Sequence, residues 1–131
     1  MTTNVIDKFQ PVTKEVDASG FTRFRNSKGK LHQNGDEPAV ISEDYKEFWK
    51  NGKLHRDGDK PAVVGKGLRM YYQKGKLHRA NGKPAVVSIV VEYYENGVKH
   101  REGGKPATQG GFEDPEYWIR GKYKHKALVE Q

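Results

Sequence analysis

Histidine is the residue type in this chain best suited to chemistry, because imidazole binds zinc and exchanges protons near neutral pH. The five copies are His32, His55, His78, His100 and His125. Each histidine lies in one copy of a repeated segment of the sequence, described below. If each copy of this repeat forms two or three strands about 4.8 Å apart, equivalent histidines lie about 10–15 Å from one another. Ligands of one zinc ion all lie about 2 Å from it. We therefore predict no metal, no cofactor and no catalytic residue, although a repeat that formed one full coil would stack the rings at about 4.8 Å.

A structural role fits five equivalent histidines better than an active site does. A ring beside a turn can donate its N–H to a turn carbonyl and fix the hairpin. We expect this role for His32, His55, His78 and His100. The enzyme alternative is a His-dependent nuclease or metal-dependent hydrolase that uses His55 or His78 with Asp57. The chain has no glycine-rich phosphate loop, no GxSxG turn and no cysteine, so we expect that it is not an enzyme.

Arginine directly follows three of the histidines, at Arg56, Arg79 and Arg101. A guanidinium holds a phosphate or a carboxylate through two parallel hydrogen bonds. It can equally lie over an aromatic ring with its charged end in water. Both readings remain open from the sequence.

These side chains belong to a sequence motif that occurs four times, Gly-Lys-Leu-His followed by Pro-Ala. A degenerate fifth copy lacks the Pro-Ala. The glycines of the motif are Gly29, Gly52, Gly75, Gly97 and Gly121, at steps of 23, 23, 22 and 24 residues. Such a period indicates a repeat architecture. Asn51-Gly52 is a strong hairpin signal, since a type I′ turn needs positive φ at both central residues. Gly52, Gly75 and Gly97 are therefore predicted to be structural.

The predicted fold class is all-β, an elongated antiparallel meander of about five tandem hairpin repeats of about 23 residues. We expect two or three short strands in each repeat. Residues 1–20 form an N-terminal cap or arm, residues 21–111 form four β-hairpin repeats, and residues 112–131 form a degenerate fifth repeat with a C-terminal cap. Neighbouring repeats must complete the core, because a single hairpin cannot bury its own face.

An aromatic pair precedes each of the last four repeat glycines. The pairs are Phe48-Trp49, Tyr71-Tyr72, Tyr93-Tyr94 and Tyr117-Trp118. Because neighbours on a strand point to opposite faces, one ring of each pair should face the core with Leu31, Leu54, Leu77 and the valines at 40, 63–64 and 86–87. We expect the other rings to face outward as interface anchors. These are Trp49, Tyr72, Tyr94 and Trp118.

Composition points to a folded, soluble, cytoplasmic domain. The 131 residues include no cysteine and no apolar run of about 18 residues. The net charge is +7, and residues 21–111 hold 18 basic against 10 acidic groups. A basic body attracts nucleic acid, anionic surfaces or an acidic protein, but the same lysines can simply keep a flat sheet soluble.

The pattern aromatic-aromatic-x-Asn-Gly-x-x-His-Arg-x-x-Gly-x-Pro-Ala resembles tandem repeats of uncharacterised bacteriophage and large-DNA-virus proteins over about residues 21–125. It is more loosely similar to the MORN repeat, whose pattern lacks the His-Arg and Pro-Ala pairs. Gln33 in the first copy and Val98-Lys99 in the fourth depart from the pattern. The resemblance implies an extended β-repeat sheet and a viral accessory role, and it carries no catalytic residues.

From these observations we predict a non-catalytic basic binding module that docks a protein, such as a host factor, through one sheet face. Arg56, Arg79 and Arg101 would orient that partner and speed association. The alternative is sequence-nonspecific binding of nucleic acid by Lys, Arg and the outward rings. No membrane contact is expected, and a homodimer through an exposed sheet edge is a further prediction.

Overall fold

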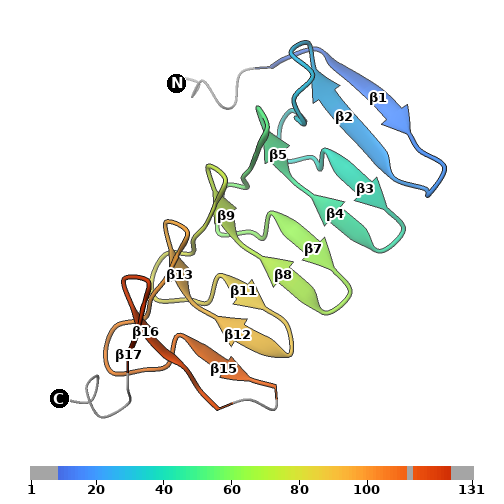
Figure 1. Cartoon of the computed structure of the whole chain (residues 1–131). Coiled ribbons are helices and arrows are strands. Elements are labelled where there is room, and N and C mark those ends of the chain that lie inside the picture. The colour runs from blue at the N-terminus through green and yellow to red at the C-terminus, as the bar shows by residue number, and fades with distance from the viewer. Residues whose placement is uncertain (1–8, 112–113, 125–131) are drawn as a thin grey trace.

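The chain forms a ladder of stacked β-hairpins, and its fold class is all-β, as the sequence predicts (Figure 1). The computed structural model describes residues 9–111 and 114–124. Within them there is no helix, and so none of the length and apolar character that crossing a membrane requires. The predictions for His125, for the end of the C-terminal cap and for the first eight residues lie outside the described residues.

One nine-stranded antiparallel sheet, called here the main sheet, runs the length of the molecule. Its strands, in spatial order, are β1 (Val12–Val16), β2 (Thr22–Asn26), β3 (Val40–Ser42), β4 (Tyr45–Glu47), β7 (Val63–Gly65), β8 (Leu68–Met70), β11 (Val86–Val87), β12 (Val90–Glu92) and β15 (Thr108–Gly110). Spatial order follows chain order throughout, which is the meander that the sequence predicts.

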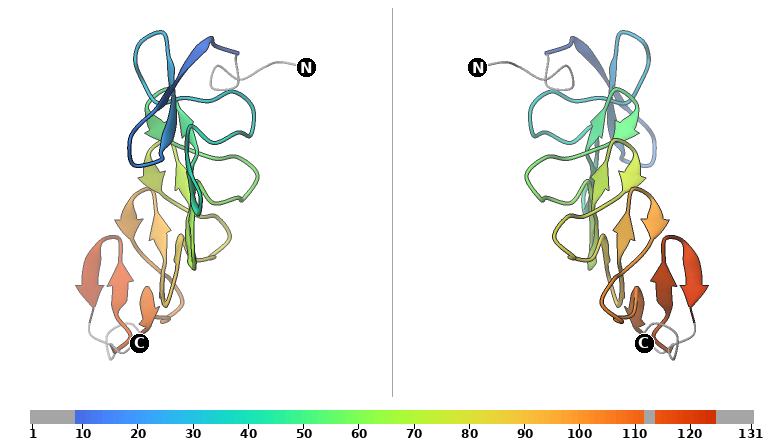
Figure 2. Two further views of the ribbon diagram at one scale, coloured as in Figure 1. Left: turned by 90° about the vertical axis from the view of Figure 1, so that its right-hand side faces the viewer. Right: turned by 90° about the vertical axis from the view of Figure 1, so that its left-hand side faces the viewer.

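Four small two-stranded hairpins lie beside the main sheet. They are β5 (Trp49–Lys50) with β6 (Lys53–Leu54), β9 (Tyr72–Gln73) with β10 (Lys76–Leu77), β13 (Tyr94–Glu95) with β14 (Val98–Lys99), and β16 (Tyr117–Ile119) with β17 (Lys122–Lys124). Viewed from the side, loops that lead from these hairpins back to the main sheet project outward in a stack (Figure 2).

A complete repeat therefore contains four short strands, and the expectation of two or three was wrong. In the first three pairs the division falls at the first aromatic residue, which is Phe48, Tyr71 or Tyr93. Phe48 N–H donates to the Ala62 carbonyl in the main-sheet direction (2.7 Å), while the Phe48 carbonyl accepts from His55 N–H on the hairpin side (3.0 Å). The chain thus leaves one sheet and enters the next hairpin at a single residue, a break that strand periodicity alone does not reveal.

Four alanines form the most deeply buried line of the molecule, at 0% exposure. They are Ala39, Ala62, Ala85 and Ala107. Val40, Val63 and Val86 are buried beside them, as predicted, whereas Leu31, Leu54 and Leu77 are only half-buried. The carbonyls of the last three alanines accept from the residues at which the chain leaves the main sheet: Ala62 from Phe48 N–H, Ala85 from Tyr71 N–H and Ala107 from Tyr93 N–H. Because interiors are close-packed, a larger side chain at such a fully buried position would crowd its neighbours.

The hairpin turns have the backbone conformation that the sequence predicts. The first turn residue has a positive φ in four copies, at Asn51 (49°), Lys74 (51°), Asn96 (49°) and Arg120 (49°). Gly52, Gly75 and Gly97 follow with φ of 81°, 83° and 81°. Since both central residues are left-handed, these are type I′ geometries, and the twist of the hairpins follows from them.

The described part of the N-terminal segment belongs to the sheet. Strand β1 pairs with β2 along its whole length, from Val12 opposite Asn26 to Val16 opposite Thr22. Gln10 ties this strand to the next repeats, through Asn34 and Asn51. The two edges of the main sheet are therefore β1 and β15, and dimerisation through a sheet edge stays a prediction.

Candidate functional site

Each of the four histidine rings that the structure describes accepts a hydrogen bond from the turn of the following repeat. The Nδ1 atom of His32 accepts from Asn51 N–H (3.0 Å), and that of His55 from Lys74 N–H (3.0 Å). His78 and His100 repeat the contact with Asn96 N–H (3.1 Å) and Arg120 N–H (2.8 Å). From the sequence we expected each ring to donate its N–H to a turn carbonyl within its own hairpin. The bond has the opposite polarity and joins two repeats.

This bond sets the protonation of the ring. Because Nδ1 accepts, the neutral ring carries its proton on Nε2. In His55 that nitrogen lies 2.8 Å from the Asp57 carboxylate, so both ring nitrogens are occupied and the side chain is 4% exposed. Burial lowers the pKa of His32, which is fully buried. Burial thus favours the uncharged form of His32.

A second bond supports every turn from the preceding repeat. Gly52 N–H donates to the Leu31 carbonyl (2.8 Å), Gly75 N–H to Leu54 (2.8 Å) and Gly97 N–H to Leu77 (2.7 Å). At Gly52 the preceding repeat is also close, since a Cβ there would come within 3.3 Å of the Lys30 side chain. The predicted structural glycines therefore lie at junctions between repeats.

The three arginines lie against the buried rings of their own repeats. The guanidinium carbons of Arg56, Arg79 and Arg101 stand 3.7, 3.8 and 3.8 Å from the ring centroids of Phe48, Tyr71 and Tyr93. Each Nη1 also donates to the carbonyl of the repeat proline, at 3.1, 3.2 and 3.1 Å. The arginines thus stack on the inward ring of each pair, not on the outward one.

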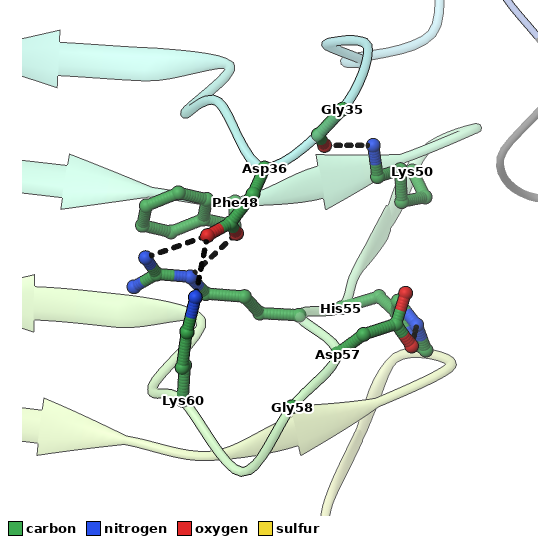
Figure 3. A pocket seen from close by; sticks show the side chains of 9 residues that line it. Gly35, Asp36, Phe48, Lys50, His55, Asp57, Gly58 and Lys60 are labelled. Atoms are coloured by element: carbon green, nitrogen blue, oxygen red, sulfur yellow. Dashed lines mark hydrogen bonds and ion pairs between the residues drawn. The ribbon is translucent and has the colours of Figure 1, made fainter.

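Two of these arginines also hold a carboxylate from the preceding repeat. Arg56 Nε and Nη2 lie 2.8 and 3.2 Å from the two Asp36 oxygens, and Lys60 Nζ lies 3.1 Å from Oδ2 (Figure 3). This arrangement of arginine, lysine and carboxylate is called here the carboxylate clamp. The Arg56 guanidinium lowers the pKa of Asp36 to about 2.

The next repeat builds the same clamp from equivalent residues. Arg79 Nε and Nη2 lie 2.9 and 3.5 Å from the Asp59 oxygens, and Lys83 Nζ lies 3.2 Å from Oδ2. The Arg79 guanidinium lowers the pKa of Asp59. Sequence reasoning missed both aspartates, although each lies two residues before a repeat proline and 20 residues before its arginine.

The predicted outward rings share one face and are half-buried. Trp49, Tyr72, Tyr94 and Trp118, called here the aromatic row, occupy equivalent places in successive repeats. Their partners Phe48, Tyr71 and Tyr93 are 5, 7 and 9% exposed, so one ring of each of these pairs faces inward as expected. Burial raises the pKa of Tyr94 to about 12, with Glu92 adding to the effect.

Carboxylates fix three rings of the aromatic row. Trp49 Nε1 donates to Glu47 (2.8 Å), the Tyr94 hydroxyl to Glu92 (3.3 Å) and Trp118 Nε1 to Glu116 (3.0 Å). Met70 takes the corresponding place before Tyr72. Sequence reasoning missed these glutamates, although each lies two residues before its ring, the spacing that places both side chains on one face of a strand.

Comparison with known proteins adds no family. A scan against protein-family models, a search of curated proteins and a search of solved structures each gave no match. Among the described residues, no three His, Asp or Glu side chains gather as ligands for a metal ion.

Proposed function

We propose that the chain is a non-catalytic binding module that docks another protein on the aromatic row. The observation that carries the proposal is the repeated orientation of Trp49, Tyr94 and Trp118 by carboxylates of the same face. Half-buried rings with fixed orientation lose little side-chain entropy when a partner covers them. Trp and Tyr are also the residues that contribute most to protein interfaces.

The charge of this face supports a protein partner over nucleic acid. Glu47, Glu92 and Glu116 lie beside the rings, and a phosphate chain stacked there would meet their negative charge. Lys99 offsets part of that charge, since its Nζ lies 3.3 Å from Glu92 and 3.7 Å from Glu116. The resemblance to phage and viral repeats makes a host-cell protein the first partner to test.

The test is capture from a bacterial lysate by the tagged chain, with and without nuclease, followed by affinity measurement with the purified partner. Tyr72→Ala is the most informative variant, because in the described part of the chain no carboxylate is hydrogen-bonded to this ring, and removing the ring there leaves no hydrogen-bonding group without its partner. We expect Tyr72→Ala to weaken the free energy of binding to the partner by about 2 kcal/mol, or roughly 30-fold in affinity. Ile89→Ala is the matched control, since Ile89 is apolar, 80% exposed and outside the row. Equal affinity of both variants would refute the proposal.

Nucleic-acid binding remains the second candidate, favoured by the opposite face of the main sheet. Lys46 and Arg69 are exposed there and lie opposite Val64, a half-buried residue, in the strand register. Nucleic acid bound at this face would be released steeply by salt. Capture that vanishes with nuclease, and a Lys46→Ala/Arg69→Ala double variant that reduces it, would favour this candidate.

A further inference from the structure

The carboxylate clamp lacks its carboxylate at one junction. Arg101 and Lys105 occupy the places of Arg79 and Lys83, but the position equivalent to Asp59 is Gly82. Among the described residues Arg101 has no carboxylate partner: its Nη1 donates to Pro106 and its guanidinium stacks on Tyr93. In the preceding repeats, the arginine Nε and Nη2 hold the aspartate. In Arg101 these two nitrogens have no carboxylate partner among the described residues.

The guanidinium of Arg101 is held in the same pose as its two equivalents. Its distance to the ring below is 3.8 Å, against 3.7 and 3.8 Å for Arg56 and Arg79, and its bond to the proline carbonyl is 3.1 Å, against 3.1 and 3.2 Å. The cation is therefore oriented before any ligand arrives. A preorganised fork loses less entropy on binding a carboxylate than a flexible side chain does.

The space for a ligand is present. Gly82 and Arg101 line a hollow of about 190 Å³ together with Tyr93 and Lys83. A Cβ built on Gly82 would meet no atom within 4 Å. A carboxylate that arrives from outside the chain therefore has room to enter where Asp59 sits in the repeat before.

We propose that Arg101 and Lys105 form a binding site for an external carboxylate, such as an Asp or Glu side chain of a partner, at the place that Gly82 leaves open. The chain itself shows the ligand chemistry twice, in Asp36 and Asp59. The hollow also borders Tyr94 of the aromatic row, but the carboxylate site does not depend on docking at that row, and different variants test the two.

Two nearby carboxylates do not block the site. Glu95 and Glu102 lie 3.8 and 3.5 Å from His100 Nε2. Glu102 is the equivalent of Asp57 in the earlier repeat. There, Asp57 bonds His55 while Asp36 is still held by Arg56, so both carboxylates are accommodated. Figure 3 shows that Asp57 lies beside His55 and apart from Asp36, so the two carboxylates do not compete for one place.

The test follows the side-chain Nε–H signals of the arginines by ¹H–¹⁵N NMR while sodium acetate replaces sodium chloride at constant ionic strength. We expect a saturable shift at Arg101 and none at Arg56 or Arg79, whose clamps are filled. Gly82→Asp should move the Arg101 signal to the position of Arg79 and abolish its response to acetate. The substitution suits the backbone, because Gly82 has φ 66° and Asp59 already adopts φ 53° at the equivalent place.

Asp59→Gly supplies the matched control, since it should open a second site and make the Arg79 signal respond to acetate. An Arg101 signal that does not saturate, or one that responds equally in Gly82→Asp, overturns the proposal. Tighter binding of inorganic phosphate than of acetate overturns its assignment to a carboxylate. Two peptides then separate the sources: one with an internal aspartate and an amidated end, and one with asparagine there and a free C-terminal carboxylate. Binding of the second alone overturns the assignment to a side chain.

Discussion

Removing the His55 ring should weaken the junction between two repeats by an amount that the structure allows to be worked out. His55→Ala removes the acceptor of Lys74 N–H. Leaving a buried donor unsatisfied costs about 1–3 kcal/mol, and loss of a well-packed side chain costs about 2–5 kcal/mol. His55 borders a hollow of about 420 Å³, so water can reach part of the space, and the lower end of each range applies. Adding the two lower ends, we expect His55→Ala to reduce the free energy of unfolding by about 3 kcal/mol.

His55→Asn and His55→Gln separate the hydrogen bond from the packing. The asparagine Oδ1 takes the place of Nδ1 and can accept from Lys74 N–H, whereas the glutamine oxygen takes the place of Nε2. Asparagine should therefore recover about 1 kcal/mol relative to alanine, the usual contribution of such a bond, and glutamine should recover less.

The assay combines urea unfolding with amide hydrogen exchange at Lys74. Exchange of that amide should speed up in His55→Ala and return toward the parent rate in His55→Asn. His78→Ala is a useful comparison, because His78 is more exposed and has Ala80 in place of Asp57; its loss should be smaller. Equal unfolding midpoints for the alanine and asparagine variants, with Lys74 exchange unchanged, would refute the reasoning.

Three further predictions concern a turn, the core and acid. Lys74→Asn should raise the free energy of unfolding by about 1 kcal/mol, since asparagine tolerates φ near 51° better than lysine; Lys74→Ala should give no gain in the same urea titration. Ala62→Val should cost about 1–3 kcal/mol by overpacking, against about 0.5 kcal/mol or less for the exposed Ala80→Val. Because burial lowers the pKa of His32 below 6.5, the unfolded chain takes up the proton first. The contribution of His32 to stability is therefore complete above pH 6.5 and declines below it. Urea midpoints at about pH 7.5 and about pH 5 should differ less in His32→Asn than in the parent, and an equal difference would contradict this.

The features that follow local rules could be predicted from the sequence. The type I′ turn at Asn51-Gly52 depends on two adjacent residues, and the burial of Phe48 beside half-exposed Trp49 depends on strand alternation. The repeat architecture followed from the period of the glycines. The two hairpins of each repeat did not, because the chain turns out of the main sheet at Phe48 without a glycine or proline to mark the place.

The contacts between repeats could not be predicted, because a period says how far apart equivalent residues are and not which of them touch. His55 meets Lys74 at a separation of 19 residues, less than one period. The clamp had a sequence signal nonetheless: Asp36 with Arg56 and Asp59 with Arg79 share a separation of 20 residues. Only the structure shows that the two partners of each pair meet.

The junction at Gly82 connects stability with binding. The histidine bond is kept there, from His78 to Asn96. Two other bonds of the earlier junctions change: Gly82 replaces the clamp aspartate, and Glu95 replaces Gln73, whose amide donates to the Arg56 carbonyl (2.8 Å). Since each repeat is stabilised by its neighbours, this junction should be the weaker one until a carboxylate occupies Arg101. A ligand that supplies this bond from outside stabilises the folded chain by mass action, so binding at Arg101 should stiffen the ladder between its third and fourth repeats.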